Sequence, residues 1–445
     1  MAIGKMLGRQ ELMTSAASGP ETNIVRGTPF TIAAYRGREG LARIEGDWDR
    51  VVRGLEHPRF LHLYDWYWSY LEALEADDST VHFFVAYRDG EPVAVFPLKS
   101  SFRVRKGMKL RFLEIPRHPH LPLSDFIGAR KEQTHGVLKA LLKHLEGDGR
   151  GPAPQPAWDY LSFQVLLEDS CAAAWLESDR PPLLLVEQSA KCNYIPTSSS
   201  YEEIEKNFSV NFRDNLRKAR NKLCATAAVE FLSSRDRSTL RTLFEEFLEV
   251  ESSGWKGIEG TGSAIKLHPD LTRFYRNLID TFSPKGACEI NLLRERGKCI
   301  AGQFCLRVAD TCYVLKIGYD EAHSRLAPGN MLMEWLLKTL AAEGEVKVLN
   351  LVTSAKWHEN WKPRSDRVFN AYLFRRSPRG LLLWGYKALR RNVAPAKSGM
   401  TSIRTRPDAR PRLSTATRTR AALRPLMRPR PFVSRWNAGA DRRAG

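Results

Sequence analysis

The 445-residue sequence predicts an α/β (α+β) fold built from two copies of one domain. Two observations support this prediction. Each half contains a hairpin, a further strand, a helix and a closing strand, in that order. The hairpin sequences "DGEPVAVFPL" and "RGKCIAGQFCL" also resemble each other, with Gly90 aligned on Gly297 and Ala94 on Ala301. The repeated order indicates a duplication, and the alternative is chance recurrence of a common arrangement.

The first half is predicted to open with a strand and an aromatic-rich helix before its hairpin. The hairpin turns at Asp89 and Gly90, a pair that favours a tight turn between strands. Gly147 marks the end of the second helix. The expected elements are a strand at 28–37, a helix at 60–74, a hairpin at 81–103, a strand at 109–116, a helix at 131–147 and a strand at 158–166.

The second half is predicted to repeat this order after two helices. Its hairpin turns at Arg296 and Gly297, and Gly344 ends its last predicted helix. The expected elements are helices at 239–253 and 268–282, a hairpin at 287–308, a strand at 311–319, a helix at 329–344 and a strand at 346–352.

A single long basic helix is predicted to cross between the two domains. Ser200 and Glu203 fit the capping box that starts a helix. Arg213, Arg217 and Arg220 share one face, and apolar residues recur at helical spacing on another. The predicted organisation is a flexible leader at 1–28, a degenerate N-terminal domain at 29–195, this inter-domain helix at 196–224, a C-terminal domain at 225–390 and a disordered basic tail at 391–445.

The formal net charge of +19 is concentrated near the C-terminus. From Arg390 onward, fifteen Lys and Arg stand against Asp408 and Asp441, so this segment carries +13 and the remainder +6. The tail is either a solubilising segment or one that contacts anionic lipid or nucleic acid through charge. Because interleaved aromatic residues are scarce, nucleic acid is not expected as a partner. A weak contact with an anionic membrane surface fits the tail and the amphipathic stretch 380–391.

The cysteines and apolar runs favour a cytoplasmic protein. None of the seven cysteines forms a CxxC pair, which predicts reduced thiols rather than a disulfide framework or a zinc site. No apolar run approaches the ~20 residues of a membrane span, and the first residues lack the apolar core of a signal peptide. His118 and His120 have no third ligand in reach, so no metal is expected.

A proline–glycine corner, Pro328-Gly329, stands where the strand at 311–319 hands over to a helix. Unpaired N–H groups and the positive end of the helix dipole make such a corner suitable for phosphate. Pro328 sets φ for a helix start, Gly329 lets a ligand approach the backbone, and Asn330 adds a side-chain donor. The corner is therefore either a phosphate site or an ordinary strand-to-helix turn.

Several stretches resemble the GNAT acyltransferases, and more closely the two-domain CelD/BcsL-like acetyltransferases, which are related to the FemABX aminoacyl transferases. The resemblance covers roughly 60–375 and rests on four stretches: "WKGIEGTG", "IAGQFCL", "LKIGYDEAHSRLAPGNML" and "NFRDNLRKARNKL". Two features depart from the family pattern. Gly329 is the one glycine left in the phosphate loop, with Arg325 as a remnant of its usual start. In "TSAKWHENW", His358 stands where the family usually has lysine.

The resemblance implies tandem GNAT-like domains, with mixed sheets flanked by helices, and acetyl-CoA or another acyl-CoA as co-substrate. Backbone N–H groups of the 313–319 strand, near Leu315 and Ile317, would polarise the thioester carbonyl. The residues expected to hold the pyrophosphate are Arg325, Pro328, Gly329 and Asn330.

The same resemblance supplies candidates for chemistry and for substrate contact. His358 is the candidate base because its ordinary pKa lies near neutrality, the alternative being a surface histidine. Tyr319 and Asp320 are expected to orient the acceptor, although an Asp after a strand is often a turn former. The residues expected to contact substrate are Trp255, Lys256, Trp357 and Trp361.

The predicted function is acyl transfer to an amine or hydroxyl acceptor. The resemblance implies an acceptor among small molecules or glycan precursors of an exopolysaccharide or envelope polymer. One alternative keeps the fold and takes aminoacyl-tRNA as donor, with the basic helix holding RNA phosphates. The other is a degenerate domain that binds a partner in polysaccharide assembly without catalysis.

Overall fold

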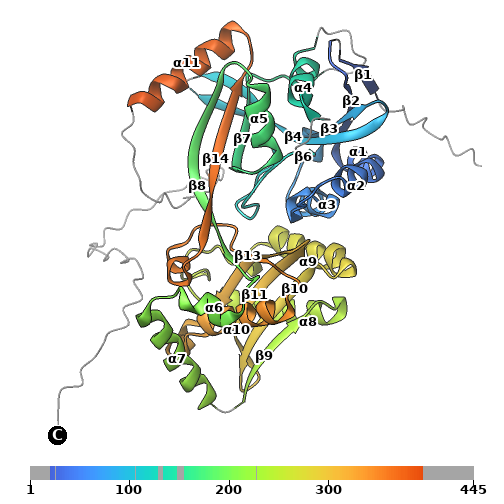
Figure 1. Cartoon of the computed structure of the whole chain (residues 1–445). Coiled ribbons are helices and arrows are strands. Elements are labelled where there is room, and N and C mark those ends of the chain that lie inside the picture. The colour runs from blue at the N-terminus through green and yellow to red at the C-terminus, as the bar shows by residue number, and fades with distance from the viewer. Residues whose placement is uncertain are drawn as a thin grey trace, which may run out of the picture. The chain divides into compact units, whose positions relative to one another are not determined.

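The computed structural model describes residues 21–393 apart from 26, 106, 129–133, 148–154 and 227 (Figure 1). For 21–24, 105 and 391–393 it describes the backbone only. The predicted tail from 394 onward and the first 20 residues of the predicted leader lie outside the described residues. The leader prediction is wrong for Glu21–Ile24, which forms strand β1 against β2.

The described strands form one mixed sheet of 14 strands. Their order is β1-β2-β3-β4-β5-β7-β14-β8-β13-β12-β11-β10-β9, with β6 paired to β4. The strands are β1 (Glu21–Ile24), β2 (Thr31–Arg36), β3 (Val81–Arg88), β4 (Glu91–Arg105), β5 (Met108–Glu114), β6 (Ile127–Gly128), β7 (Tyr160–Leu167), β8 (Leu184–Pro196), β9 (Val229–Ser234), β10 (Cys288–Glu295), β11 (Lys298–Val308), β12 (Thr311–Tyr319), β13 (Val348–Asn350) and β14 (Arg364–Phe374).

Helices cover both faces of this sheet, as an α/β architecture requires. The α-helices are α1 (Gly37–Arg43), α2 (Glu45–Arg53), α3 (Tyr64–Ala73), α4 (Val137–Glu146), α5 (Cys171–Asp179), α6 (Tyr201–Lys206), α7 (Val210–Cys224), α8 (Arg237–Ser252), α9 (Pro269–Phe282), α10 (Pro328–Glu343) and α11 (Pro378–Val393). Short 3-10 helices are η1 (Phe60–His62), η2 (Asp78–Thr80), η4 (Ile265–Leu267), η5 (Ser283–Lys285), η6 (Glu321–Leu326) and η7 (Lys356–Trp361).

Strand alternation divides the core into three clusters. In β3, Phe83 and Val85 face a cluster with α1–α3, whereas Phe84 and Ala86 face α4 and α5. The first cluster continues into the second half, where α8 and α9 pack on β10–β12. Trp66 of α3 meets Phe274 of α9 at a ring-centroid distance of 5.3 Å, so the halves share this part of the core. The third cluster joins α6, α7 and α10 to the opposite face of β10–β13.

The repeated order predicted from the sequence is present in both halves. The series β3–β4–β5–α4–β7 is matched by β10–β11–β12–α10–β13. In each series the last two strands pair in parallel. Asp89-Gly90 and Arg296-Gly297 both turn with positive φ at the two positions, the geometry of a tight hairpin turn.

Two long strands that the sequence analysis did not foresee join the halves. β8 pairs with β14 over much of its length and with β13 at its end. β14, which follows the second half, also pairs with β7 of the first half. In Figure 1 this ribbon runs from the first half to the second. The continuous sheet therefore arises because the last strand inserts between β7 and β8.

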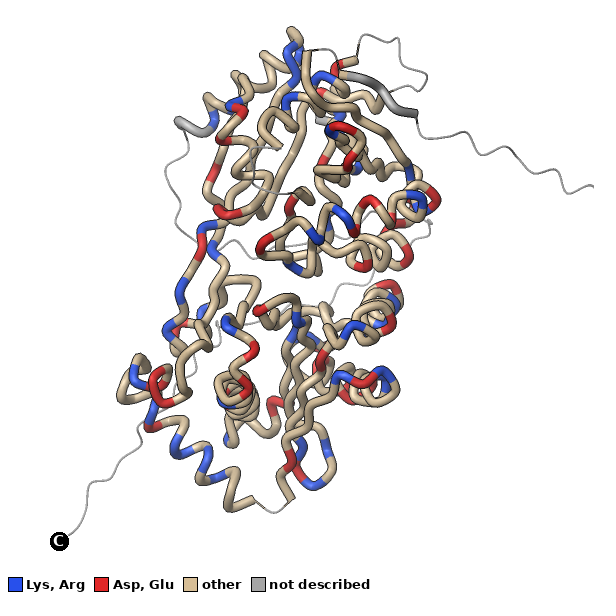
Figure 2. The backbone as a smooth tube through the Cα atoms, turned by 45° about the vertical axis from the view of Figure 1, so that its right-hand side comes forward, with Lys and Arg blue, Asp and Glu red and all other residues tan. Residues whose placement is uncertain are grey.

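The structure has two helices in place of the single helix expected over 196–224. α6 ends near Asn207, and Ser209 caps α7 by accepting the Phe212 N–H at 3.2 Å. The apolar face of α7 packs in the third cluster with α10, within the second half. Figure 2 shows Lys and Arg positions spaced along α7, and Arg213, Arg217 and Lys218 are exposed. The link between halves is thus made by β8 and β14 rather than by this helix.

The described part of the chain contains no helix with the length and apolar character that a bilayer crossing requires.

Candidate functional site

The sheet opens where β12 leaves β13. The two strands pair in parallel only from Thr311 to Tyr313 against Val348 to Asn350. The chain then turns away at Val352, whose φ of 51° lies in a region that β-branched residues rarely adopt. This turn is held by the Val352 N–H, which donates to the Asn350 side-chain oxygen at 2.8 Å. The edge of β12 beyond Tyr313 therefore faces a gap.

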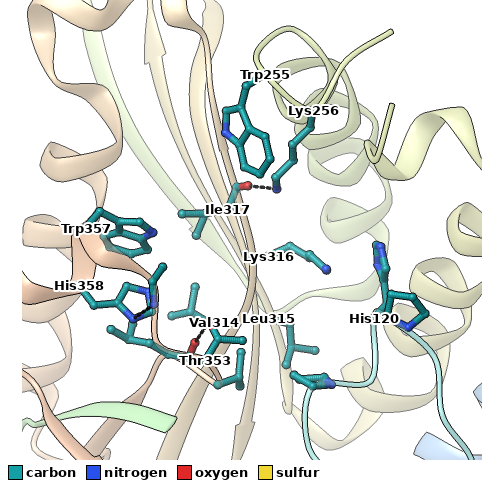
Figure 3. A pocket seen from close by; sticks show the side chains of 15 residues that line it. His120, Trp255, Lys256, Val314, Leu315, Lys316, Ile317, Thr353, Trp357 and His358 are labelled. Atoms are coloured by element: carbon teal, nitrogen blue, oxygen red, sulfur yellow. Dashed lines mark hydrogen bonds between the residues drawn. The ribbon is translucent and has the colours of Figure 1, made fainter. Parts of the chain in front are cut away.

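A β-bulge lies in β12 beside this gap. Lys316 pairs with Phe304 and Val314 with Cys305, so Leu315 is an extra residue in the register. Bulges leave a residue unpaired and re-aim side chains, and they are frequent beside active sites. In Figure 3, Leu315 and Lys316 point to one side of β12, while Val314 and Ile317 point to the other. The backbone at Leu315 is thus available to a ligand.

A cavity of about 220 Å³ surrounds the bulge. Its walls come from a loop of the first half, the loop after α8, β12 and the segment after β13 (Figure 3). A space of this size holds an acyl group and a reacting amine rather than a whole nucleotide. The lining residues are Pro119, His120, Pro122, Trp255, Lys256, Val314, Leu315, Lys316, Ile317, Leu351, Val352, Thr353, Ala355, Trp357 and His358.

Lys316 is a lining residue whose pKa is shifted into the physiological range. Burial, together with the nearby Lys256 ammonium, lowers the pKa of Lys316 to about 7, against the opposing effect of Glu251. An amine with this pKa is partly neutral at physiological pH and can accept a proton. Lys316 was not among the predicted site residues. The signal that would have found it is a lysine inside an apolar strand, between Leu315 and Ile317.

Lys256, predicted to bind substrate, lines the cavity but is bonded to the protein. Its Nζ donates to Glu251 Oε1 at 2.8 Å and to the Ile317 carbonyl at 2.6 Å. Glu251 is buried and also accepts the Ile265 N–H at 2.8 Å. These bonds tie the loop after α8 to β12, so Lys256 acts on the cavity by fixing its wall and by its charge.

His120 brings the first half into the cavity wall. Its Nδ1 lies 3.2 Å from the Tyr275 hydroxyl of α9. Burial and the neighbouring positive charges lower the pKa of His120 to about 2, so the ring is neutral. From the sequence, His118 and His120 were candidates only for metal binding. Within the described residues no group of three or more His, Cys, Asp or Glu side chains could hold a metal ion.

His358, the predicted base, lines the cavity but its Nδ1 is already engaged. That atom accepts the Ala355 N–H at 3.2 Å and lies 3.2 Å from the Asn193 side-chain nitrogen. The proton must therefore sit on Nε2. Burial lowers the pKa of His358 to about 4. A ring whose accepting nitrogen holds the η7 turn is suited to positioning the 353–358 loop rather than to proton abstraction.

The predicted aromatic contacts lie in different environments. Trp357 and Trp255 line the cavity, and Trp255 is 55% exposed. Trp361 is buried in the third cluster, where its ring meets Phe208 at 5.4 Å and Phe212 at 5.1 Å. A side chain with 1% exposure is part of the core, so this position does not fit the predicted substrate contact.

Tyr319 and Asp320, predicted to orient an acceptor, do not line this cavity. Burial alone would raise the pKa of Asp320, but Lys298 at 2.8 Å and the Ala322 N–H lower it. Asp320 therefore starts η6 and holds an ion pair, which matches the alternative of a turn former. The Tyr319 ring lies beside Gly329, since a Cβ there would meet Tyr319 at 3.5 Å.

The Pro328 corner also lies outside the residues that line the cavity. The N–H groups of Asn330 and Met331 both donate to the Ala327 carbonyl, at 2.9 and 3.0 Å. Among the described groups of this first turn, the Gly329 N–H is left without a partner. The corner thus offers one amide to a phosphate instead of the several expected, with the exposed Arg325 nearby in sequence.

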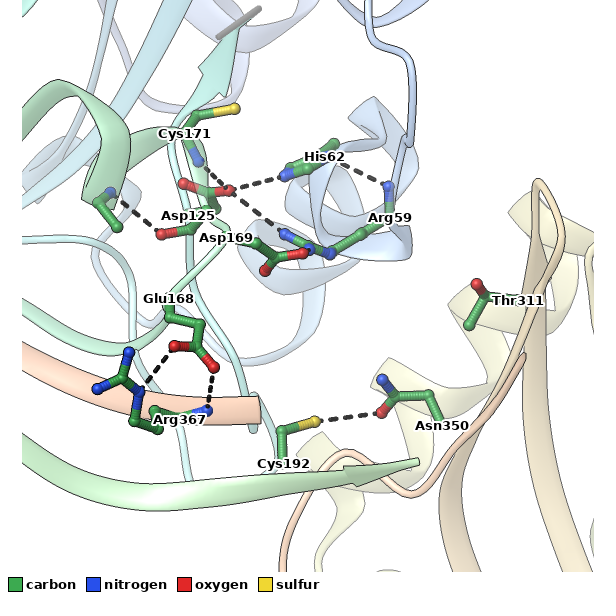
Figure 4. A network of polar contacts seen from close by, with 12 residues as sticks. Arg59, His62, Asp125, Glu168, Asp169, Cys171, Cys192, Thr311, Asn350 and Arg367 are labelled. Atoms are coloured by element: carbon green, nitrogen blue, oxygen red, sulfur yellow. Dashed lines mark hydrogen bonds and ion pairs between the residues drawn. The ribbon is translucent and has the colours of Figure 1, made fainter. Parts of the chain in front are cut away.

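A polar network of the first half joins Arg59 and His62 to Asp125 (Figure 4). Asp125 is buried and accepts two N–H groups at the start of α5. His62 Nε2 lies 3.1 Å from Asp125, and Arg59 lies 3.9 Å from the same carboxylate. These contacts fix η1, so that Phe60 packs on Tyr313 of β12 at 4.9 Å. The network therefore positions the strand that carries the bulge.

Comparison with known proteins supports the fold that this geometry indicates. A family model described as an acetyltransferase (GNAT) domain matches residues 210–363. No curated protein matches the sequence significantly. The crystal structure of FemX is similar at 13% identity, with a TM-score of 0.51, covering 76% of this chain and 98% of that one.

Two further solved structures match with lower TM-scores. One is a tandem GNAT protein from the clavulanic acid biosynthesis pathway, at 11% identity and a TM-score of 0.42, covering 76% of this chain and 98% of that one. The other is L-PGS from Bacillus licheniformis, at 14% identity and a TM-score of 0.44, covering 77% of this chain and 96% of that one. The chain therefore has a GNAT-like acyltransferase fold, and the predicted fold class is confirmed.

Proposed function

We propose that this protein transfers an acyl group from acyl-CoA to an amine or hydroxyl acceptor. The observation that carries the proposal is the bulge at Leu315, which leaves backbone unpaired where β12 separates from β13. A backbone N–H at that position can stabilise negative charge on a carbonyl oxygen during acyl transfer. The cavity beside it is large enough for the reacting groups.

Lys316 is the proposed base. The acceptor nitrogen attacks the thioester carbonyl carbon, the C–S bond breaks, and the acceptor proton passes to the neutral Lys316 amine. The resulting ammonium then returns this proton to the departing thiolate, so the residue ends the cycle neutral. Glu251 and Lys256 hold the strand and tune this amine. His358 and His120 keep the two sides of the cavity in place.

The structure offers more groups to the acyl end of acyl-CoA than to its pyrophosphate. The bulge and the cavity suit a thioester, whereas the α10 start offers the single free Gly329 amide. Arg325, exposed near the end of η6, supplies a positive charge for the pyrophosphate. The likeness to the CelD/BcsL-like sequences is what supports a cytoplasmic enzyme acting on an amino sugar or another envelope-polymer precursor.

Titration calorimetry with acetyl-CoA tests the donor. We expect saturable heat, and coenzyme A without the acetyl group should bind comparably because the same nucleotide is held. Turnover is followed by thiol release with glucosamine as the probe acceptor. Lys316→Met should lower turnover by about 10²- to 10⁴-fold while leaving the binding heat unchanged. Absence of saturable heat with acetyl-CoA would contradict the proposed donor.

A second candidate donor is aminoacyl-tRNA, and two observations favour it. α7 exposes Arg213, Arg217 and Lys218 along one side, away from the core, and the α10 start offers little to a pyrophosphate. This donor would be supported if acetyl-CoA gives no binding heat and tRNA does bind. The tRNA affinity should then weaken steeply with salt and be reduced by Arg213→Glu. If neither acetyl-CoA nor tRNA binds, a non-catalytic binding protein would be supported.

A further inference from the structure

The last helix, α11, leaves an apolar face open to solvent. Leu382, Tyr386 and Leu389 follow each other at helical spacing and are 75%, 46% and 67% exposed. Leu381 adds a fourth side chain at 51%. The opposite side of the helix packs on β14. Exposed leucines gathered on one face mark a contact surface more strongly than scattered ones do.

The tip of the β4–β5 hairpin, near the start of α11, also exposes apolar side chains: the register places Phe102 and Val104 on one side of the hairpin and Met108 on the other. Phe102, Val104 and Met108 are 60%, 66% and 56% exposed. Arg379, in the first turn of α11, donates to the Lys109 carbonyl of β5 and pairs with Asp159 at 3.2 Å. The hairpin and the first turn of α11 are therefore neighbours.

Positive charges lie among these apolar side chains. The ammonium of Lys109 is 4.3 Å from the Phe102 ring centroid. The Arg390 guanidinium lies 5.6 Å from the Tyr386 ring. Long basic side chains that cover apolar surface in this way place their charges at its rim.

We propose that α11 and the β4–β5 tip form a docking face for an anionic lipid surface. Apolar side chains surrounded by Lys and Arg are what a helix lying in a membrane interface presents. A second copy of this face would bring like charges together, which opposes self-association through it. The segment 394–445 carries thirteen Lys and Arg against two Asp, a net charge of +11, so it is not complementary to this face either. The same charges add attraction to anionic lipid.

Flotation of the full-length protein with vesicles tests the face. We expect binding to phosphatidylcholine vesicles that contain phosphatidylglycerol, and weak binding to pure phosphatidylcholine. Binding should weaken above about 0.1 M salt, where the Debye length falls below about 10 Å. Leu382→Glu should reduce partitioning into the vesicles about tenfold, because it removes apolar area that the membrane would bury and adds a charge that anionic lipid repels.

Val210→Glu is the matched control. Val210 is 64% exposed on α7, so the substitution changes charge and exposed surface equally but elsewhere in the molecule. It should leave partitioning within about twofold, since only the general charge changes. Equal binding by Leu382→Glu and wild type would overturn the proposal, because the tail alone would then carry it. No binding to anionic vesicles, or a dimer in sedimentation velocity that Leu382→Glu dissociates, would overturn it as well.

Discussion

Lys316 is the residue whose ionisation most directly bears on the chemistry of the cavity. Its amine should react with acetic anhydride with a midpoint near pH 7, whereas an ordinary lysine titrates near about 10.4. Competitive labelling read by mass spectrometry gives this pKa without any activity assay. Lys256→Met should raise the pKa of Lys316, because a like charge is removed while Glu251 remains. A midpoint near that of ordinary lysines would contradict the proposed base.

The two tryptophans of the 357–361 segment should respond differently to truncation. Trp361→Ala should cost about 3–5 kcal/mol of unfolding free energy, since it empties a buried core position. Trp361→Phe should cost far less, because the indole N–H of Trp361 has no hydrogen-bond partner to lose. Trp357→Ala should change stability by less than about 1 kcal/mol and act on substrate use instead. Urea denaturation measures all three variants, and equal losses for Trp357→Ala and Trp361→Ala would contradict the assignment.

Residue types alone predicted only some of the side chains that line the cavity. The sequence predicted Trp255, Lys256 and Trp357 as substrate contacts and His358 as the base, and all four line the cavity. It could not show that the accepting nitrogen of His358 is taken by a backbone N–H, because that depends on a turn seen only in three dimensions. Whether a side-chain atom is free to accept a hydrogen bond depends on the fold rather than on the residue type.

At the scale of elements, Gly318 near the end of β12 and Gly329 at the start of α10 should tolerate alanine differently. A Cβ on Gly318 would lie 2.6 Å from the Glu251 Cα of α8, so Gly318→Ala should cost about 1–3 kcal/mol. At Gly329 the nearest atom would be 3.5 Å away, an ordinary contact, so stability should change by less than about 1 kcal/mol.

Binding provides the second measurement on this pair. If the Gly329 amide meets a phosphate, the added methyl of Gly329→Ala hinders the approach and should weaken acetyl-CoA binding about tenfold. Thermal unfolding checks the first expectation and calorimetry the second. Unchanged acetyl-CoA affinity in a stable Gly329→Ala protein would remove the corner from the donor site.

Elements with strong apolar periodicity were predictable, and elements without it were not. The hairpins, β12 and α10 carry alternating or helical patterns and clear turn glycines, so their ranges followed from the sequence. β8 was missed because its middle residues are mostly exposed, and β14 because its first residues are, as expected of a ribbon that crosses between halves. The bulge at Leu315 has no local sequence signature, since it depends on the register with β11.

At the scale of the molecule, duplication does not yield two independent cores. The last strand of the chain pairs with β7 of the first half, and α3 packs on α9 of the second. Substitutions in one half should therefore affect the stability of the other, and unfolding should be a single transition for the described part of the chain. The order of elements was predictable, but this exchange of a strand was not, because strand partners are set by long-range packing.

The same molecule buries neutral histidines in both halves, which predicts acid lability. Burial lowers the pKa of His82, His144 and His358 to about 4 and that of His120 to about 2. The unfolded chain binds these protons near about pH 6.5, whereas the folded chain does not. Stability should thus be highest above about pH 6.5 and fall progressively toward pH 4, with urea midpoints dropping before most carboxylates titrate.

His144→Leu isolates one of these contributions. His144 is 7% exposed, its Nε2 has no hydrogen-bond partner, and its ring packs on Phe84, so leucine fits an apolar site. Removing its titration should stabilise the variant relative to wild type by about 2 kcal/mol more at pH 5 than at pH 8, from proton linkage alone. A stability difference that is the same at both pH values would show that His144 already binds its proton in the folded state. Buried histidine would then not be what makes the fold sensitive to acid.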